Sequence, residues 1–315
     1  MKTYIPLICM TFMLSNAYNA FSQRFDKIYF NNEAFKADMY GPVKSQRLVV
    51  NDKEGLPQLR EVGQETYILE EKYNNKQIRT TEQLFNTEGL QIGKSEILHD
   101  KNGFATEILY TDLFDNLINR VTYEYNADGN WKRVTKYDVY YNPMEIVYYD
   151  YTPEKQISEI KKTNQEGTVL ERQIFLYDSI GNNIELIDYG KDGKQISHTE
   201  YLYNPKGKVV SYRTLEGSSD DMILYYEANF QNDTLLLNTV VEKFLGEMQI
   251  SREEFIFDPL GNILKSISTD LNVSPAPSTT EYLYEWDLWG NWTKQVIKKD
   301  TVEEVAAERS IEYYQ

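Results

Sequence analysis

A short turn motif recurs along most of this chain at a nearly constant spacing. Each copy reads aromatic, any residue, aromatic, Asp or Asn, two residues, Gly. The clearest copies are 123–130 (YEYNADGN), 175–182 (FLYDSIGN), 201–208 (YLYNPKGK), 255–262 (FIFDPLGN) and 284–291 (YEWDLWGN). Taking the Asp or Asn position as the anchor, the spacing is 26 residues five times and then 27, 27 and 29. The anchors are Asn74, Asp100, Asn126, Thr152, Asp178, Asn204, Gln231, Asp258 and Asp287. A fixed period of this length predicts stacked copies of one supersecondary unit.

A second, weaker series of turns lies twelve residues after each anchor. Its positions are Asn86, Asp112, Asp138, Asn164, Gly190, Glu216, Lys243, Asp270 and Lys299. An Asp or Asn side chain that begins a turn accepts hydrogen bonds from the backbone two residues on, and a following glycine supplies positive φ. Between turns, aromatic and β-branched residues alternate with polar ones, which is typical of strands. The sequence therefore predicts an all-β antiparallel meander of about 18–19 short strands, built from 26-residue hairpin repeats.

A sheet this large must twist, curl or close. We expect an open sheet that curls or spirals around its aromatic face, rather than a membrane barrel. The predicted strands have seven to nine residues, whereas a spanning strand needs about 9–11. Charged residues such as Glu124, Arg172 and Glu253 lie within them, and a charge on a lipid face costs about 2–4 kcal/mol at the membrane midplane. An outer-membrane β-barrel is kept as an alternative, because many antiparallel strands and many tyrosines suit one.

The chain divides into three parts. Residues 1–22 have the form of a secretory signal peptide, with Lys2 before a short apolar run and small residues before a cleavage site at Ser22. Residues 23–66 carry no clear repeat and are expected to cap the sheet, because repeat arrays need capped ends. Residues 67–315 form the repeat domain, with a loop expected at 275–278 (PAPS). The signal predicts an exported protein in the periplasm, at the cell surface or outside the cell.

The repeat resembles the YD repeat of RHS-repeat proteins. The resemblance rests on the [YF]-x-[YF]-[DN]-x-x-G-[NK] unit, with the best copies at 123–130, 175–182, 201–208, 255–262 and 284–291. In that family the repeats build long β-sheets that spiral into a shell, and large members enclose a C-terminal toxin. The period here is 26 residues rather than about twenty, and few residues follow the last turn. The resemblance therefore implies a short, exported member without a toxin domain, and the signal sequence is similar to those of Bacteroidetes-type bacteria.

The composition excludes several kinds of function. The net charge of −16 disfavours nucleic acid, which binds basic surfaces. No apolar run is long enough for a transmembrane helix. Cys9, the sole cysteine, lies in the signal peptide, and only two histidines are present. We therefore expect no metal site, no cofactor and no catalytic residues, and no serine occupies a nucleophile-elbow motif.

The tryptophans are the candidate binding residues. Trp131 and Trp292 follow Gly-Asn at equivalent repeat positions, and Trp286 and Trp289 lie close to Trp292 in the sequence. Exposed, these four rings would form an aromatic platform for sugars; the alternative is that they fill the sheet interior.

The sequence thus predicts an exported, non-enzymatic repeat protein that acts as an envelope or secreted scaffold or binding surface. Its partner is an unidentified protein or polysaccharide. A carbohydrate-binding or glycan-active protein using the tryptophans is the first alternative, and the outer-membrane barrel is the second.

Overall fold

Twenty antiparallel strands form one continuous sheet in the computed structural model. The model describes residues 39–50, 67–86, 88–216, 222–233, 235–299 and 302–314, and these residues contain no helix. The strands are β1 (Val43–Val50), β2 (Tyr67–Tyr73), β3 (Arg79–Phe85), β4 (Gln91–His99), β5 (Ala105–Thr111), β6 (Leu117–Tyr125), β7 (Trp131–Tyr137), β8 (Pro143–Tyr151), β9 (Ile157–Asn164), β10 (Val169–Tyr177), β11 (Asn183–Tyr189), β12 (Gln195–Tyr203), β13 (Val209–Glu216), β14 (Met222–Gln231), β15 (Leu235–Leu245), β16 (Met248–Phe257), β17 (Ile263–Asp270), β18 (Ser274–Trp286), β19 (Trp292–Lys299) and β20 (Val302–Tyr313).

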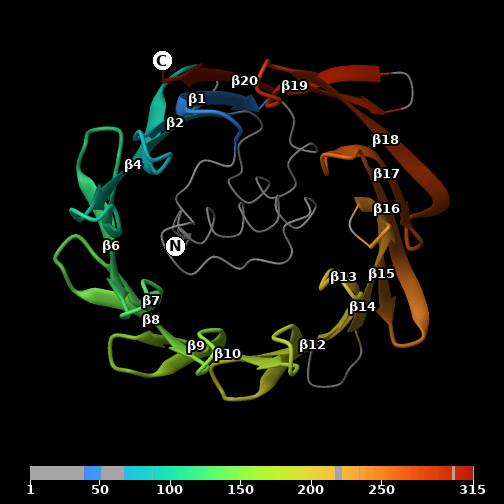
Figure 1. Ribbon diagram of the computed structural model, residues 1–315, viewed down its shortest axis with the longest axis horizontal. Helices are drawn as coiled ribbons and strands as arrows, with labels where there is room; N and C mark the ends of the chain where they lie inside the picture. The colour runs from blue at the N-terminus through green and yellow to red at the C-terminus, as the bar shows by residue number, and fades with distance from the viewer. Residues whose placement is uncertain are drawn as a thin grey trace.

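The sheet closes on itself into a barrel. Successive strands pair along the chain, and β1 pairs with both β2 and β20. Gln46 on β1 lies opposite Glu71 on one side and Ile311 on the other. Viewed down its axis, the molecule is a ring of strands in which the last strand lies beside the first two (Figure 1).

The expected open, spiralled sheet is therefore wrong, and the reason is the number of strands. Residues 67–313 supply β2 to β20, the nineteen strands that the turn pattern predicts. In an up-and-down meander of nineteen strands, the first and last strands run in the same direction. β1 adds a twentieth, so the two ends of the sheet meet as an antiparallel pair. β1 lies inside the segment 23–66, where the sequence shows no repeat; the proposed signal peptide, 1–22, lies outside the described residues.

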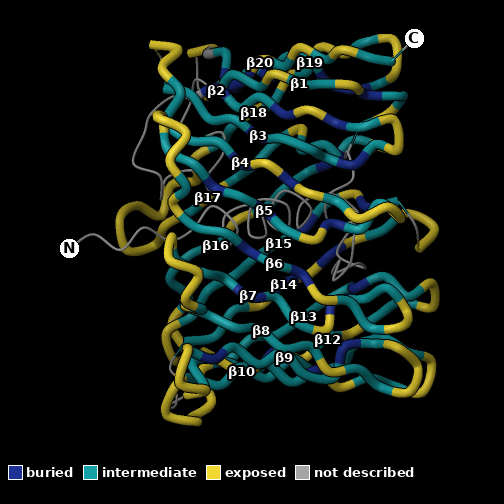
Figure 2. The backbone as a smooth tube through the Cα atoms, turned by 90° about the vertical axis from the view of Figure 1, so that its left-hand side faces the viewer, coloured by how far each residue is buried: buried dark blue, intermediate teal, exposed yellow. Residues whose placement is uncertain are grey.

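The turns have the chemistry that the sequence predicts at most anchors. At the turn after β6, the side-chain oxygen of Asn126 accepts hydrogen bonds from the backbone N–H groups of Asp128 and Asn130, both at 3.0 Å. Gly129 donates to the Asn126 carbonyl at 3.1 Å and has φ 82°. This is a three-residue hairpin loop with a bulge. Exposed residues gather in such turns at the two ends of the barrel (Figure 2).

Two local predictions fail. The expected turn at Lys243 lies two residues later, where Gly246 and Glu247 join β15 to β16. The proline-containing segment 275–278 is not a loop but part of β18. That segment lies near the start of a 13-residue strand, opposite a register shift in β17 between Ser268 and Asp270, and it precedes the ladder to β19, which begins at Thr280.

The tyrosine that directly precedes four of the anchors has a defined role in the wall. The ladder between β7 and β8 ends where Arg133 lies opposite Tyr148. Beyond that point the hydroxyl of Tyr151 donates to the carbonyl of Trp131 at 2.6 Å. The same bond recurs from Tyr125 to Ala105, Tyr177 to Ile157 and Tyr203 to Asn183, at 2.6 to 2.7 Å. At the closure, the Tyr314 hydroxyl donates to the carbonyl of Tyr73, the last residue of β2, at 2.6 Å. Burial raises the pKa of Tyr151 and of Tyr177 to about 12. Each tyrosine thus extends the hydrogen bonding between hairpins towards the rim.

The two faces of the wall differ in burial. Ile97, Ile108 and Val121 lie opposite one another on adjacent strands and are buried. Leu98 and Ile118, whose side chains point to the other face, are 37% and 49% exposed. Side chains converge on the concave side of a closed sheet and diverge on the convex side. The aromatic and aliphatic core therefore lies on the inner face.

Replacing Tyr151 by Phe tests the tyrosine bond. We expect the free energy of unfolding to fall by about 1 kcal/mol, because one buried hydrogen bond is lost and the Trp131 carbonyl loses a donor. The measurement is urea unfolding followed by fluorescence. Tyr148→Phe, on the outer face of the same strand, is the control and should change stability by less than about 0.5 kcal/mol. Equal effects of the two substitutions would contradict this role.

Candidate functional site

The four tryptophans proposed as a binding platform do not lie together. Trp286, Trp289 and Trp292 come from one hairpin, formed by the end of β18, its turn and the start of β19. Trp131 begins β7, on a distant part of the ring (Figure 1). Trp131 is 1% exposed and Trp292 is 7% exposed, so both rings are unavailable to a ligand at the outer surface.

Packing accounts for the two buried rings. Trp131 lies 5.2 Å from the ring of Tyr123 and 5.9 Å from that of Tyr149. The guanidinium of Arg309 lies 3.8 Å from the centre of the Trp292 ring. Trp286 and Trp289 remain 39% and 52% exposed, and a binding role for these two is still a prediction.

A charged cluster that the sequence analysis missed lies on the inner face of β2 and β3. Arg79 donates through Nη1 to Glu71 Oε1 and to Glu82 Oε2, both at 2.6 Å. The Tyr73 hydroxyl donates to Glu71 Oε2 at 2.8 Å, and Gln46 of β1 donates to the same oxygen. Glu71 and Glu82 are 6% and 5% exposed. Two carboxylates therefore share one guanidinium inside the wall.

The pKa values of the cluster move in different directions. Burial disfavours ionised Glu71, but the Arg79 charge and the hydrogen bonds from Arg79, Tyr73 and Gln46 outweigh it and lower its pKa. At Glu82, burial outweighs the attraction of Arg79, and repulsion from Glu71 adds to it, so the pKa is raised. Burial, with the charge of Glu71, also raises the pKa of Tyr73 well above its usual value. The arrangement holds one carboxylate firmly ionised beside a second that is easier to protonate.

The cluster occupies positions that other repeats fill with apolar residues. Ile97 and Tyr123 stand at the Glu71 position, three residues before their anchors, and Trp131 stands at the Arg79 position, five after. At the Glu82 position, eight after the anchor, the other repeats have residues such as Ile108, Val134, Ile160 and Leu186. The first repeat therefore has three charged residues at positions where the other repeats are mostly apolar, and this difference is visible in the sequence.

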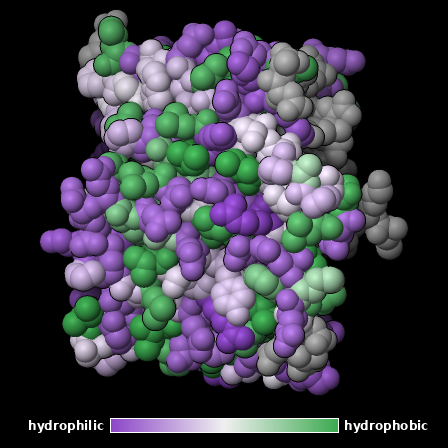
Figure 3. Space-filling model, turned by 90° about the vertical axis from the view of Figure 1, so that its right-hand side faces the viewer, coloured by the Kyte–Doolittle hydropathy of each residue, from purple (hydrophilic) through white to green (hydrophobic). Residues whose placement is uncertain are grey.

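The outer face carries ion pairs between neighbouring strands, several of them in the middle of the strands. Each pair joins a basic side chain to a carboxylate on a neighbouring strand. The pairs are Arg47–Glu70 (3.2 Å), Arg120–Glu107 (2.9 Å), Arg172–Glu159 (2.8 Å), Arg252–Glu242 (3.5 Å), Lys294–Glu285 (3.3 Å) and the close pair Arg133–Glu124. His198 Nε2 lies within hydrogen-bond distance of Glu185 Oε2, at 3.2 Å. On the side of the barrel formed by β14 to β18, hydrophilic and hydrophobic side chains are intermixed over the whole height (Figure 3).

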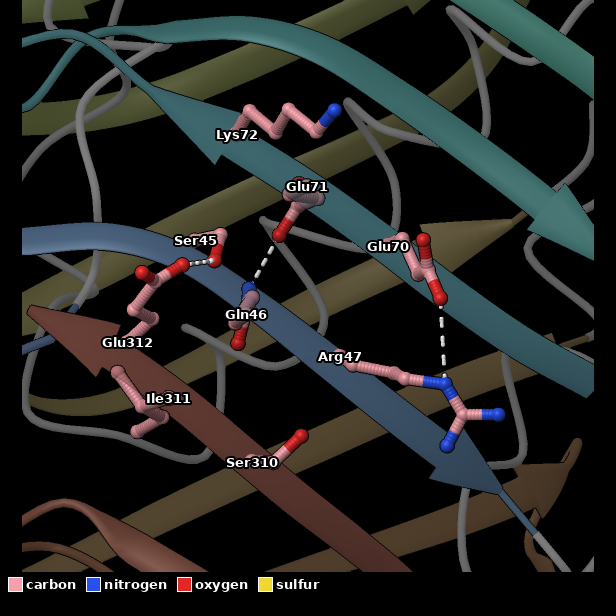
Figure 4. A pocket seen from close by; sticks show the side chains of 9 residues that line it. All are labelled: Ser45, Gln46, Arg47, Glu70, Glu71, Lys72, Ser310, Ile311 and Glu312. Carbon is pink, nitrogen blue, oxygen red and sulfur yellow. Dashed lines mark hydrogen bonds and ion pairs between the residues drawn. The ribbon is translucent and has the colours of Figure 1, made fainter.

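The closure of the barrel has the same outer chemistry. A groove of about 340 Å³ lies over β20, β1 and β2, and its side chains pair with one another (Figure 4). Arg47 bonds Glu70 on β2, and Ser45 Oγ donates to Glu312 of β20 at 3.1 Å. At the rim, the Asn291 amide bridges the closure by bonding the backbone N–H and carbonyl of Tyr40 at 2.7 and 2.8 Å. Polar contacts therefore reinforce the backbone pairing at the closure.

Neither a metal site nor a spanning helix is found in the described part of the chain. Its His, Cys, Asp and Glu residues include no group of three or more placed to hold a metal ion. Among the same residues, no helix is long and apolar enough to cross a membrane.

Comparisons with known proteins return structural similarities alone. The sequence matches no family model and no curated protein. A porin-like protein from Bacteroides uniformis is 12% identical with a TM-score of 0.38, covering 87% of this chain and 99% of that one. A porin-like protein from Bacteroides vulgatus is 11% identical with a TM-score of 0.28, covering 65% of this chain and 97% of that one. The Photorhabdus luminescens Tc holotoxin pore is 10% identical with a TM-score of 0.29, and the alignment covers 73% of this chain but 16% of that one. Similarities this weak carry no argument about function.

Replacing Arg79 by Met tests the energetics of the inner cluster. We expect the free energy of unfolding to fall by about 3–5 kcal/mol, because two buried carboxylates lose their shared counter-charge. Chemical denaturation of the purified protein measures this loss.

The matched control removes the whole cluster. Replacing Glu71, Arg79 and Glu82 together by Ile uses a residue that other repeats already have at each position. This variant should be about as stable as the parent, or more stable, because no charge is left unpaired. If the Arg79→Met variant is as stable as the parent protein, the cluster is not the buried ion network described above.

Proposed function

We propose that this chain is an exported, non-enzymatic barrel protein that acts as a scaffold or binding surface at the cell envelope. The observation that supports it is the outer face, where ion pairs such as Arg120–Glu107 and Arg172–Glu159 lie in the middle of strands. Arg120 and Arg172 are each the fourth of nine residues in their strands. Charges at that depth suit an outer wall in water, because each would cost about 2–4 kcal/mol against lipid.

The export part of the proposal rests on residues 1–22, which have the form of a signal peptide. The periplasm, the cell surface and the medium all suit an acidic protein of this kind. The resemblance to YD repeats supports a repeat-built surface as the working part of the molecule. The partner would be a protein or a polysaccharide, with Trp286 and Trp289 among the exposed aromatic residues available for contact.

An outer-membrane barrel is the second candidate, and one observation favours it. The wall closes with an even number of antiparallel strands, twenty, as single-chain outer-membrane barrels do. Exposed apolar residues such as Leu176, Leu202 and Leu283 also lie on the outer face. Against it, hydrophilic and hydrophobic side chains are intermixed over the side formed by β14 to β18, where no uninterrupted apolar band is seen (Figure 3).

Cell fractionation separates the two candidates. After expression with its native N-terminus in a Gram-negative host, we expect the mature protein to leave the membrane fraction on washing with alkaline carbonate. A known integral outer-membrane barrel from the same cells is the control and should remain in the pellet. Retention of this protein in the pellet, with heat-modifiable migration on a gel, would replace the proposal by the membrane barrel.

A further inference from the structure

The outer wall is not uniform, because the repeat is altered over β14, β15 and β16. A groove of about 610 Å³ opens there, on the side of the barrel seen in Figure 3. Its lining is mixed: Ile223, Tyr225, Val240 and Phe244 are apolar or aromatic, and Glu227, Glu242, Glu247 and Arg252 are polar. Glu242 lies opposite Tyr225 on β14 and Arg252 on β16.

The groove exists because the repeat is altered at this place. The anchor spacing lengthens from 26 to 27 residues here, and the three strands have 10, 11 and 10 residues. The usual three-residue turn is replaced by a two-residue hairpin with Gly246 at its first position, φ 59°. A positive φ at that position fits a type II′ turn. The longer strands extend the outer face towards this rim, and the hairpin brings Glu247 to the groove.

The polar groups of the groove are held in place by one another. Glu242 Oε1 accepts a hydrogen bond from Gln249 Nε2 at 3.0 Å and lies 3.5 Å from Arg252 Nε. Both terminal nitrogens of Arg252 lie 3.2 Å from Glu254 Oε2. The Glu242 carboxylate and the Arg252 guanidinium are therefore held by polar contacts to each other, to Gln249 and to Glu254.

The aromatic groups are also fixed. The rings of Tyr225 and Phe244 meet edge to face, with centroids 5.5 Å apart and an interplanar angle of 89°. Tyr225 nevertheless remains 37% exposed. An ordered aromatic surface therefore lies beside the planar polar groups.

We infer that this groove binds a neutral saccharide. A sugar ring has an apolar C–H face and an edge of hydroxyl groups, which suit a lining where the aromatic ring of Tyr225 lies beside the Glu242 carboxylate and the Arg252 guanidinium. The lining carries three carboxylates and one guanidinium, so a basic peptide, represented by hexalysine, is the competing ligand in the test. The inference rests on the proposed function as a binding surface, and it identifies the class of partner and the strands that contact it.

The test is direct binding to the purified mature protein. Isothermal titration with cellohexaose, xylohexaose, mannohexaose and chitohexaose should give saturable binding for at least one of them. Tyr225→Ala and Glu242→Gln should each weaken that binding by at least about tenfold, a change of about 1.4 kcal/mol. Tyr148→Ala, on the outer wall of β8 where Lys161 lies 5.6 Å from the ring centre, is the matched control and should leave binding unchanged. Circular dichroism and thermal melting establish that each variant is folded.

Three results would overturn the inference. The first is that no hexasaccharide in the panel binds. The second is that binding survives both groove substitutions in folded variants. The third is that hexalysine binds and no saccharide does. The last result would make the groove a site for basic peptides. Failure here is distinct from failure of the proposed function, because a protein released by carbonate can still lack saccharide binding.

Discussion

The structure depends on the requirement that every strand edge in a large sheet find a partner. An open meander would expose two edges, each a row of unpaired N–H and C=O groups. The chain meets the requirement with an even number of strands, since β1 runs antiparallel to β20 and pairs with it over most of its length. Closure then defines an inner and an outer face, and the chemistry of each face follows from it.

The repeat motif serves this closed wall in two ways. Its Asp or Asn and its glycine form the turn, and its tyrosine bonds the neighbouring hairpin near the rim. At the closure a tyrosine also bonds a backbone carbonyl, since Tyr314 donates to Tyr73 at the end of β2. This bond and polar contacts such as Asn291 to Tyr40 add to the backbone pairing of β1 with β2 and β20. The outer side chains are not needed for these turns and tyrosine bonds. They form ion pairs on many strands and a groove over β14 to β16.

The sequence predicted much of the wall, because turns are local. Asn126 to Gly129 form the turn that their residue types predict, and the strands from residue 67 onwards are the nineteen that the spacing indicates. Closure was not predictable in this way, because β1 has no repeat motif and pairs with residues more than 250 positions away. The buried Glu71, Arg79 and Glu82 were missed because carboxylates are common in turns and strands of an acidic chain. The prediction that Trp131 and Trp292 belong to an exposed platform was wrong for a different reason. Their side chains point to the inner face of the wall, and the motif alone does not specify the face.

Closure is the central claim, and a cross-link across β1 and β20 tests it most directly. Ser45 and Glu312 lie opposite each other at this junction, so Ser45→Cys with Glu312→Cys, in a Cys9→Ser background, places two thiols on paired strands. Mild oxidation should give an intramolecular disulfide in the monomer, seen as faster migration on a non-reducing gel and as a linked peptide by mass spectrometry. Ser45→Cys with Ser211→Cys, on β13, should give no such bond. If the first pair forms only intermolecular disulfides, or none, the sheet is open and the account is wrong.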